Sequence, residues 1–349
     1  MKKLTVVAIA LAGAFQAQAA EVYKNDTTSL DLYGRIYAGQ FFGDKKDGTN
    51  DYSAKQGANQ FVRFGAKADS QINSNLKALA QYEVQLYVNN SEKTLTNDST
   101  DNLRTRLAFA GVTGDWGTLT FGRQKGAMGS IEDWTDVAYS DGYGADGTGV
   151  GTDTFGTNRA ASVLKYSGLF GGLQVDTSYK FDSNDTETPT TDDKAKDSAY
   201  GAAVSYTFPF NLSLGTAYNV GHREAANTDD AKLWLVSAKF DNKALYAAFT
   251  YADGQDFLGT GIDHTGYEAV LGYSFANGFG LQALWNKQKQ DNGGVKKDNV
   301  DYYTLAAQYK FNKQLRVIGE YRINNLDDTS ATTAEKTKDD YSVAVRYDF

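Results

Sequence analysis

Apolar and polar side chains alternate with a period of two through most of this chain. In the first such segment, Leu30, Leu32, Ile36 and Ala38 fall on one face, with polar or aromatic residues between them. This pattern is typical of strands that meet an apolar environment on one side and water on the other. Sixteen candidate strands follow from it, at residues 30–38, 62–66, 76–88, 107–111, 119–121, 164–166, 173–181, 200–208, 212–220, 234–240, 245–251, 267–275, 279–285, 303–311, 315–323 and 341–349.

The connections between these strands alternate in length. Short turns are expected at residues 113–115, 209, 241–242, 276–277 and 312–313. Eight long loops are expected at residues 43–59, 89–102, 125–158, 182–198, 221–230, 252–265, 286–299 and 324–339. Short turns at one end and long loops at the other are typical of transmembrane β-barrels, in which the short turns are periplasmic.

Composition agrees with an all-β chain that meets lipid through alternating residues. The chain has 35 Gly, 23 Tyr and 19 Phe but only two prolines, and its mean hydropathy is −0.50. A soluble β-sandwich is the alternative, but sixteen strands with alternating polar faces leave too little apolar surface for two packed sheets. We therefore predict a 16-stranded antiparallel transmembrane β-barrel with short periplasmic turns, long extracellular loops and one loop inside the lumen.

The first nineteen residues resemble a secretory signal peptide. Lys2 and Lys3 precede an apolar run at residues 4–15 and a small-residue cleavage site at residues 17–19. The apolar run is far shorter than the roughly 20 residues of a spanning helix. We expect a cleaved signal peptide at residues 1–19, export from the cytoplasm and a single barrel domain at residues 20–349.

Charge and residue usage limit the possible functions. The chain has 35 basic and 43 acidic residues, so removing Lys2 and Lys3 leaves 33 − 43 = −10 charges. An acidic chain without a basic cluster argues against nucleic acid as a partner. With no cysteine and no closely spaced histidine pair, we expect no metal site and no cofactor.

Residues 125–158 form the longest predicted connection. They carry six acidic residues against the single basic residue Lys125. A connection of this length inside a compact domain is usually functional or disordered, and its aromatic residues argue against disorder. We expect it to enter the barrel and restrict the pore.

Charged residues on the opposite face of the strands, such as Arg35, Arg63, Glu83, Arg106 and Arg322, indicate a wet interior. Burial of such charges away from water costs several kcal/mol each. A barrel of this size can enclose an aqueous channel.

Several segments resemble the general trimeric porins of the Gram-negative outer membrane. They are AEVYKN at 20–25, DLYGR at 31–35, RFGAK at 63–67, QINS at 71–74, NNSE at 89–92, TRLAFAG at 105–111, GR at 122–123 and the terminal Phe349. The resemblance implies a homotrimer in an outer membrane that contains lipopolysaccharide, with the third loop folded into the pore.

The resemblance also assigns roles to individual residues. It places a basic wall at Arg35, Arg63, Arg106 and Arg159. The acidic loop group falls on Asp136, Asp141, Glu132 and Asp133, although Ser140 stands where the family has a glutamate. Glu92 would latch a neighbouring subunit, and Tyr347 and Phe349 would form the signal for the barrel-assembly machinery.

A basic wall facing an acidic loop would create a transverse field that low-dielectric walls focus. Small hydrophilic solutes and ions would then diffuse passively, and we expect a moderate preference for cations because acidic residues crowd the long loops. A sugar- or anion-specific channel is the nearer alternative, but the lumenal aromatics Tyr33, Tyr37, Phe61 and Tyr87 look scattered.

An outer-membrane barrel enzyme is the more distant alternative. Hydrolysis by a Ser-His-Asp arrangement requires a histidine oriented by a carboxylate and reaching a hydroxyl. Only His222 and His264 are available, and Asp263 beside His264 is a chance neighbour in so acidic a chain.

Overall fold

The computed structural model describes residues 20–43, 57–89, 102–182, 198–223, 229–326 and 338–349. The predicted signal peptide lies outside these residues. The strands are β1 Ala20–Lys24, β2 Thr28–Gly43, β3 Gly57–Asn73, β4 Leu76–Tyr87, β5 Leu103–Gly114, β6 Gly117–Lys125, β7 Arg159–Phe170, β8 Leu173–Lys180, β9 Ser198–Thr207, β10 Leu212–His222, β11 Ala231–Asp241, β12 Leu245–Gln255, β13 Ile262–Ser274, β14 Phe279–Asn292, β15 Val295–Lys310, β16 Leu315–Asn324 and β17 Asp340–Asp348. A short helix, α1, spans Gly129–Glu132.

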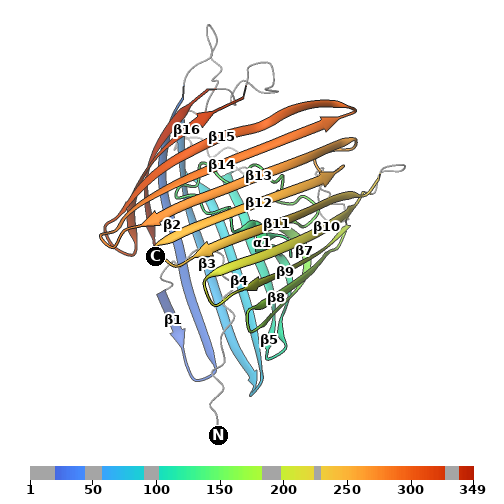
Figure 1. Ribbon diagram of the computed structural model, residues 1–349. Coiled ribbons are helices and arrows are strands. Elements are labelled where there is room, and N and C mark those ends of the chain that lie inside the picture. The colour runs from blue at the N-terminus through green and yellow to red at the C-terminus, as the bar shows by residue number, and fades with distance from the viewer. Residues whose placement is uncertain (1–19, 44–56, 90–101, 183–197, 224–228, 327–337) are drawn as a thin grey trace.

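Strands β2 to β17 form a closed antiparallel ring (Figure 1). Each strand pairs with its neighbours in the sequence, and β17 closes the ring by pairing with β2 from Asp340↔Gly43 to Asp348↔Arg35. The predicted 16-stranded barrel is confirmed. Closure satisfies the backbone groups that an open sheet edge would expose to lipid.

The additional strand β1 was not predicted. It pairs with β2 from Ala20↔Leu32 to Lys24↔Ser29, where β17 no longer covers that edge of β2. Its five residues are exposed, which is why they carry no clear apolar alternation.

Two of the predicted long loops are wrong. Residues 252–265 contain the ends of β12 and β13, and residues 286–299 form a hairpin that turns at Gly293 and Gly294. Both turn residues have positive φ, +59° and +89°, as tight hairpin turns require. The alternation was hidden because both faces of these strand ends are polar.

The alternating faces are oriented as the sequence predicts. Leu271 is 57 % exposed on the outer face, whereas the next residue, Gly272, lies on the inner face. At the short-turn end, aromatic pairs lie on the outside, with ring centroids 4.7 to 5.1 Å apart: Tyr206 and Phe208, Tyr273 and Phe275, Tyr309 and Phe311. This arrangement is the girdle expected where a barrel meets lipid headgroups.

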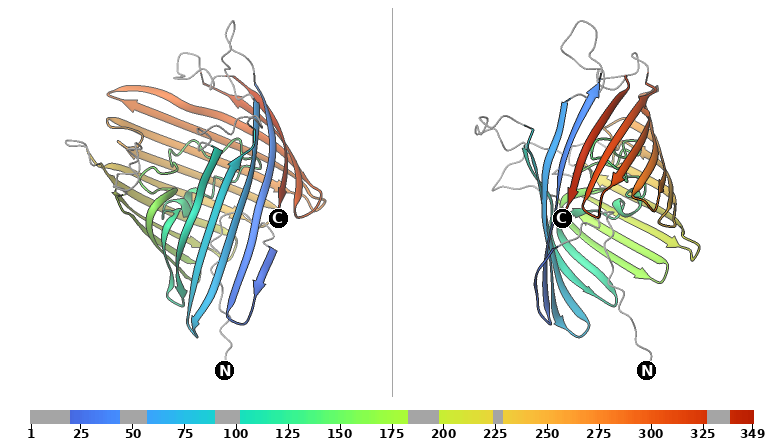
Figure 2. Two further views of the ribbon diagram at one scale, coloured as in Figure 1. Left: turned by 180° about the vertical axis from the view of Figure 1, so that it is seen from behind. Right: turned by 90° about the vertical axis from the view of Figure 1, so that its left-hand side faces the viewer.

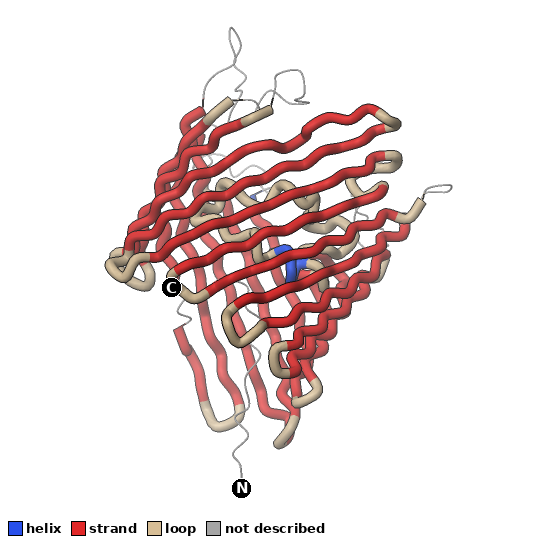
Figure 3. The backbone as a smooth tube through the Cα atoms, viewed as in Figure 1, coloured by secondary structure: helices blue, strands red, loops and turns tan. Residues whose placement is uncertain are grey.

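The long connection between β6 and β7 lies inside the ring (Figure 2), and α1 is its only helix (Figure 3). In the described part of the chain, no helix is both long and apolar enough to cross a membrane.

Candidate pore constriction

The first part of the loop packs against an apolar inner wall. Met128, Ile131 and Trp134 are buried in one cluster with small and aliphatic residues of β9 to β12, which are Ala199, Ala203, Ala217, Ala231, Leu233, Leu235, Ala248 and Ala252. We expected a charged, wet inner face from the charged residues of β2 to β5 and β16. The inner side of β9 to β12 is instead apolar where it meets the loop, so that expectation does not hold for this wall. The apolar wall holds the loop.

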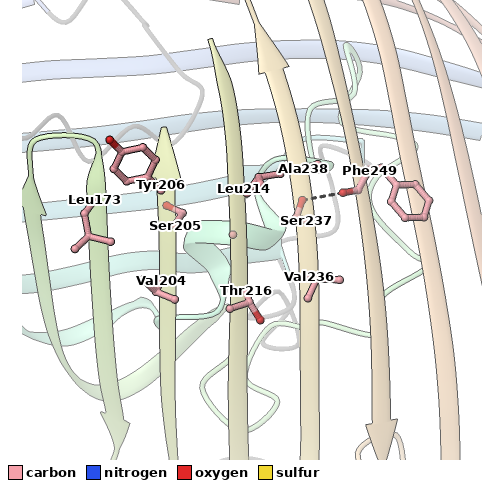
Figure 4. Close-up of a pocket in the computed structure, with 11 residues that line it drawn as sticks. Leu173, Val204, Ser205, Tyr206, Leu214, Thr216, Val236, Ser237, Ala238 and Phe249 are labelled. Carbon is pink, nitrogen blue, oxygen red and sulfur yellow. Dashed lines mark hydrogen bonds between the residues drawn. The ribbon is translucent and has the colours of Figure 1, made fainter. Parts of the chain in front are cut away.

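The outer face of these same strands is apolar as well. Figure 4 shows a recess whose outward side chains include Val204, Leu214, Val236 and Phe249 of these strands and Leu173 of the adjacent β8, with α1 visible behind the strands. This sheet therefore separates lipid-facing side chains from the loop by one layer of backbone.

A buried carboxylate of β13 holds two separate parts of the loop. Glu268 accepts hydrogen bonds from the backbone N–H groups of Gly147 and Thr148, both at 2.9 Å, and from the Thr135 hydroxyl at 2.5 Å. These three donors satisfy both oxygens of the buried carboxyl group. Glu268 thus holds two segments of the loop, at Thr135 and at Gly147 and Thr148, at one point of the wall.

The tip of the loop reaches the opposite wall. The backbone N–H of Ser140 donates to Glu320 Oε1 of β16 at 3.1 Å, and the Ser140 hydroxyl donates to the same carboxylate. Tyr143 donates to Asp340 of β17. Ser140 is therefore a donor to an acidic residue of the wall.

Asp141 meets the predicted basic wall directly. Arg35 Nη1 lies 2.9 Å from Asp141 Oδ2, and Arg63 Nη2 lies 3.3 Å from Asp141 Oδ1. Burial acts to raise the pKa of Asp141, but the charges of Arg35 and Arg63 outweigh it, and the pKa lies below its ordinary value. Asp141 is therefore ionised and bridges the loop to β2 and β3.

Two residues outside the predicted site organise the basic wall. Glu83 of β4 binds Arg106 at 2.6 Å and lies 3.9 Å from Arg63. Gln85 accepts from Arg63 Nε and Nη2 at 3.0 and 2.7 Å. The alternation along β4 places both residues on its inner face, but only the pairing of β3 with β4 brings them to Arg63.

Asp136 lies in a different environment from Asp141. Burial and the neighbouring Asp133 raise its pKa, while the positive charges of Lys125 and Arg159 act in the opposite direction. Arg159 itself, at the start of β7, donates to the Thr152 hydroxyl at 3.3 Å. Asp136 and Arg159 thus lie within electrostatic range of each other, apart from the Asp141 contacts.

Glu132, Asp133 and Asp136 form a compact acidic group, with carboxylate oxygens within 4.8 Å of one another. Lys125 pairs with Asp133 and supplies part of the countercharge. Burial, followed by the charges of Asp136 and Asp133, raises the pKa of Glu132 well above its ordinary value. Three carboxylates do not by themselves make a metal site.

The remaining predicted residues lie at the chain end and in the second loop. Phe349 exchanges backbone hydrogen bonds with Gly34, with N–H to O distances of 3.0 and 2.8 Å. Tyr347 pairs with Ile36 next to it in the same ladder. Glu92 lies outside the described residues, so its predicted latch stays a prediction.

A closed barrel with an internal loop fastened to opposite walls defines a class of membrane channel. Residues 4–329 match the family model described as Gram-negative porin, and the chain belongs to this family of outer-membrane channels. The chain is therefore an outer-membrane porin, which indicates a channel rather than an enzyme.

Particular relatives support this assignment. The outer membrane porin protein OmpD of Citrobacter koseri is 32 % identical over 371 residues, covering 98 % of each chain. Outer membrane porin PhoE of Salmonella typhimurium is 28 % identical, covering 100 % of this chain and 99 % of its own. The structure resembles Salmonella typhi OmpF, solved with daunomycin, with a TM-score of 0.82, 25 % identity and coverage of 95 % and 100 %.

Proposed function

We propose that this porin forms a water-filled channel for passive diffusion of small hydrophilic solutes and ions, with the loop at residues 125–158 as its constriction. The observation that carries the proposal is the contact of Asp141 with both Arg35 and Arg63. It joins the loop to the basic wall across the interior of the barrel, so a solute must pass the charged groups that border this contact.

The charged border consists of the basic residues Arg35, Arg63, Arg106 and Arg159, opposite acidic residues of the loop. Asp141 is bound to two of these arginines, and Asp136 lies within range of Arg159. Water confined between fixed charges of opposite sign is ordered by their field. A polar solute can align its dipole, whereas an apolar solute must displace ordered water, so hydrophilic solutes pass preferentially.

We propose a moderate preference for cations. The mature chain would carry −10 charges by the count above, and the loop itself contributes −5 from six acidic residues and Lys125. A negative potential at the entrance concentrates cations. The preference should weaken in high salt, because the Debye length falls from about 10 Å at 0.1 M to about 3 Å at 1 M.

We also propose a homotrimer in the outer membrane, beside lipopolysaccharide. A neighbouring fold, OmpT of Vibrio cholerae, has been solved in a trimer form, with 19 % identity and a TM-score of 0.67. The proposed latch residue is Glu92. The proposed assembly signal is Phe349 with Tyr347, which would be recognised by the barrel-assembly machinery before the ring closes.

A substrate-specific channel is the second candidate, and the structure weakens it. An aromatic track for sugars must expose its rings to the solute. Tyr37 and Phe61 stack with centroids 5.2 Å apart, but each is only 1 % exposed, in one cluster with Tyr139 of the loop. Both rings pack under the loop, so they present almost no surface to a solute.

Neither histidine completes a hydrolase arrangement within the described residues. His264 Nε2 lies 3.0 Å from the backbone oxygen of Thr148, and His222 Nδ1 lies 2.9 Å from Asp230. Neither imidazole contacts a side-chain hydroxyl within the described residues. Loss of a lipid- or peptide-cleaving activity in His264→Ala would contradict the channel assignment.

Conductance in a planar bilayer tests the proposal. Purified protein should insert in units that close in three equal steps, one for each subunit of a trimer. A gradient of KCl should give a reversal potential of the sign expected for cations. Insertion without ion conductance would overturn the proposal, and an anion-selective reversal potential would overturn the selectivity alone.

A further inference from the structure

The acidic group beside α1 contains a buried oxygen without a hydrogen-bond partner. Glu132 is the last residue of α1 and is only 2 % exposed, yet its Oε2 atom accepts no hydrogen bond within the described residues. Buried polar atoms in folded proteins are almost always paired with protein, water or an ion. Glu132 therefore points to a ligand that the described part of the chain does not supply.

Two further carboxylates lie at the same place. One oxygen each of Glu132, Asp133 and Asp136 lies within 4.8 Å of the other two. The backbone brings them together, because the chain keeps turning after α1 ends: the N–H of Thr135 donates to the backbone oxygen of Glu132 at 3.0 Å. Side chains four residues apart in such a turn lie on one side of it. The fold of the loop, rather than a chance approach, thus gathers the three groups.

The basic residues near this group leave the buried carboxylate without a partner. Lys125 pairs with Asp133 Oδ1, whereas Arg159 and Lys165 act on the group only through space. Acidic side chains that act on it as well are Asp146 and Glu268. Within the described residues, no cation forms an ion pair with Glu132. Three carboxylates this close repel one another, and a bound cation would relieve that repulsion.

The group opens toward the lumen. Asp136 is exposed and makes no hydrogen bond or ion pair within the described residues, and the loop that carries it lies inside the ring (Figure 2). On the opposite side, Ile131 and Trp134 are buried against β9 to β12. An ion in the channel can therefore reach the group at Asp136, and Glu132 lies at its buried end.

The ligand atoms are all carboxylate oxygens. Our expectation of no metal site considered cysteine and histidine, which zinc prefers. Oxygen ligands instead suit calcium and magnesium. Calcium binds oxygen at about 2.3–2.6 Å, so two oxygens around one ion can be roughly 5 Å apart, whereas magnesium at about 2.0–2.1 Å allows only about 4.2 Å. Three oxygens within 4.8 Å of one another fit the calcium range.

We propose that Glu132, Asp133 and Asp136 form a calcium-binding site on the loop, open to the lumen at Asp136. Water would fill the remaining positions, because calcium takes about 6–8 oxygen ligands. Lys125 competes with the ion for Asp133, so we expect a dissociation constant of about 10⁻⁴–10⁻³ M, the range of extracellular calcium modules. Bound calcium would join the buried end of α1 to the lumenal surface of the loop. The site is separate from the Asp141 contact with the basic wall.

Terbium luminescence of the solubilised protein in calcium-free buffer tests the site. Tb³⁺ occupies calcium sites and emits when a nearby indole is excited, and Trp134 is the residue next to Asp133. Excitation of tryptophan should give emission that saturates with Tb³⁺ and is displaced by calcium. Trp134→Phe should lose this emission, while calcium binding measured by calorimetry should equal that of the wild type.

Substitutions of the ligands give effects of opposite sign. Glu132→Gln should raise the half-saturating calcium concentration by about tenfold or more, since even groups that only hold a ligand in place contribute about 10–100-fold to metal affinity. Lys125→Gln should lower that concentration several-fold, because it frees Asp133 Oδ1 for the ion. Loss of a merely structural lysine would not tighten calcium binding.

The matched control is a second pair of carboxylates that shares one lysine beside a tryptophan. Asp298 and Asp301 both pair with Lys287, and Asp301 accepts a hydrogen bond from Trp285 at 3.4 Å. Asp298→Asn with Asp301→Asn should leave calcium affinity and the terbium emission at their wild-type values.

Three results would overturn the site: wild-type calcium affinity in Glu132→Gln, an equal loss of affinity in the control variant, or terbium emission that persists in Trp134→Phe. If Glu132→Gln does not assemble, Asp136→Asn decides in its place, because it changes an exposed side chain. Calcium binding is read without any current, so its failure is distinguishable from failure of the proposed channel.

Discussion

Asp141 accepts a hydrogen bond of 2.9 Å from Arg35, a residue 106 positions earlier in the chain. The same carboxylate lies 3.3 Å from Arg63, so one side chain of the loop contacts two neighbouring strands of the wall. Arg35 in turn binds Asp348 at 2.7 Å. The loop tip, the first long strand and the last strand of the barrel are thereby connected through one guanidinium group.

Asp141→Asn should shift the reversal potential in a KCl gradient toward anions. The substitution removes a negative charge at the constriction and weakens the attachment of the loop tip by about 1.5–3 kcal/mol, the range for hydrogen bonds to charged groups. Asp136→Asn should shift it in the same direction, and that shift should fade at a higher pH than the shift of Asp141→Asn, because burial and Asp133 raise the pKa of Asp136. Asp229→Asn, at an exposed loop residue, is the control, and a shift equal to that of Asp141→Asn would contradict the assignment.

Arg63→Ser should increase both single-channel conductance and cation preference. The change removes a long cationic side chain that contacts Asp141, so the passage widens and the acidic groups act with less opposition. Conductance and reversal potential are measured on the same channels. Unchanged conductance would mean that Arg63 does not border the narrowest section.

Leu271→Arg should destabilise the barrel by about 2–4 kcal/mol, the cost of a charge on the lipid face near the midplane. Gly272→Arg places the same side chain on the inner face, where the nearest atoms to a new Cβ are 3.7 Å away, and should cost less. Folding titrations in urea compare the two. Equal loss of stability in the two variants would contradict the assignment of Leu271 to the lipid face and Gly272 to the inner face.

Arginine substitutions at Leu281 and Gln282 would distinguish the two faces of β14 less clearly. Gln282 accepts from the Tyr139 N–H at 3.1 Å and donates to the Val137 backbone oxygen at 2.9 Å, so Gln282→Arg would also disturb the loop.

Deletion of residues 347–349 should reduce the yield of heat-modifiable trimer in the outer membrane. Phe349 pairs with Gly34 through two backbone hydrogen bonds, and their loss exposes unsatisfied groups at several kcal/mol each in lipid. Gly34→Val tests the same junction from the other strand, because a Cβ on Gly34 would lie 2.4 Å from the Phe349 ring. Wild-type yield of trimer in both variants would contradict the role of this junction.

Cation preference should fall as the pH is lowered from neutral toward the ordinary carboxyl pKa of about 4. Burial and neighbouring carboxylates raise the pKa of Glu132 and of Asp136, so these groups take up protons above the ordinary range of about 3.9 to 4.3 and lose negative charge first. Reversal potentials across this range measure the effect. A variant with Glu132→Gln and Asp136→Asn should lack it, and an identical pH profile would contradict the raised pKa values.

The ion pairs of Asp141 should be lost only at a lower pH than the charges of Glu132 and Asp136. The pKa of Asp141 in the folded protein lies below its ordinary value, so the stability that its ion pairs contribute is present above about pH 3.9 and is lost as the pH falls through the lower, folded value.

Much of this protein was determined by the sequence alone. Alternation over two residues is a local property, so it predicted the sixteen strands, the side of the sheet that residues such as Leu271 occupy, and the long connection between β6 and β7. The same pattern missed the strand ends near Gly293, which have polar side chains on both faces. Without an apolar face, a strand that extends beyond the bilayer shows no alternation in the sequence.

Only the tertiary structure decided which charges meet. Asp141 reaches Arg35 because the apolar side of the loop, with Ile131 and Trp134, packs on the far wall and leaves the tip to cross the lumen. The register of three strands also places Lys310, Arg316 and Arg346 opposite one another, and a shift of one residue would turn those side chains toward lipid. Register and ring closure depend on interactions between distant segments, and no local pattern in the sequence encodes them.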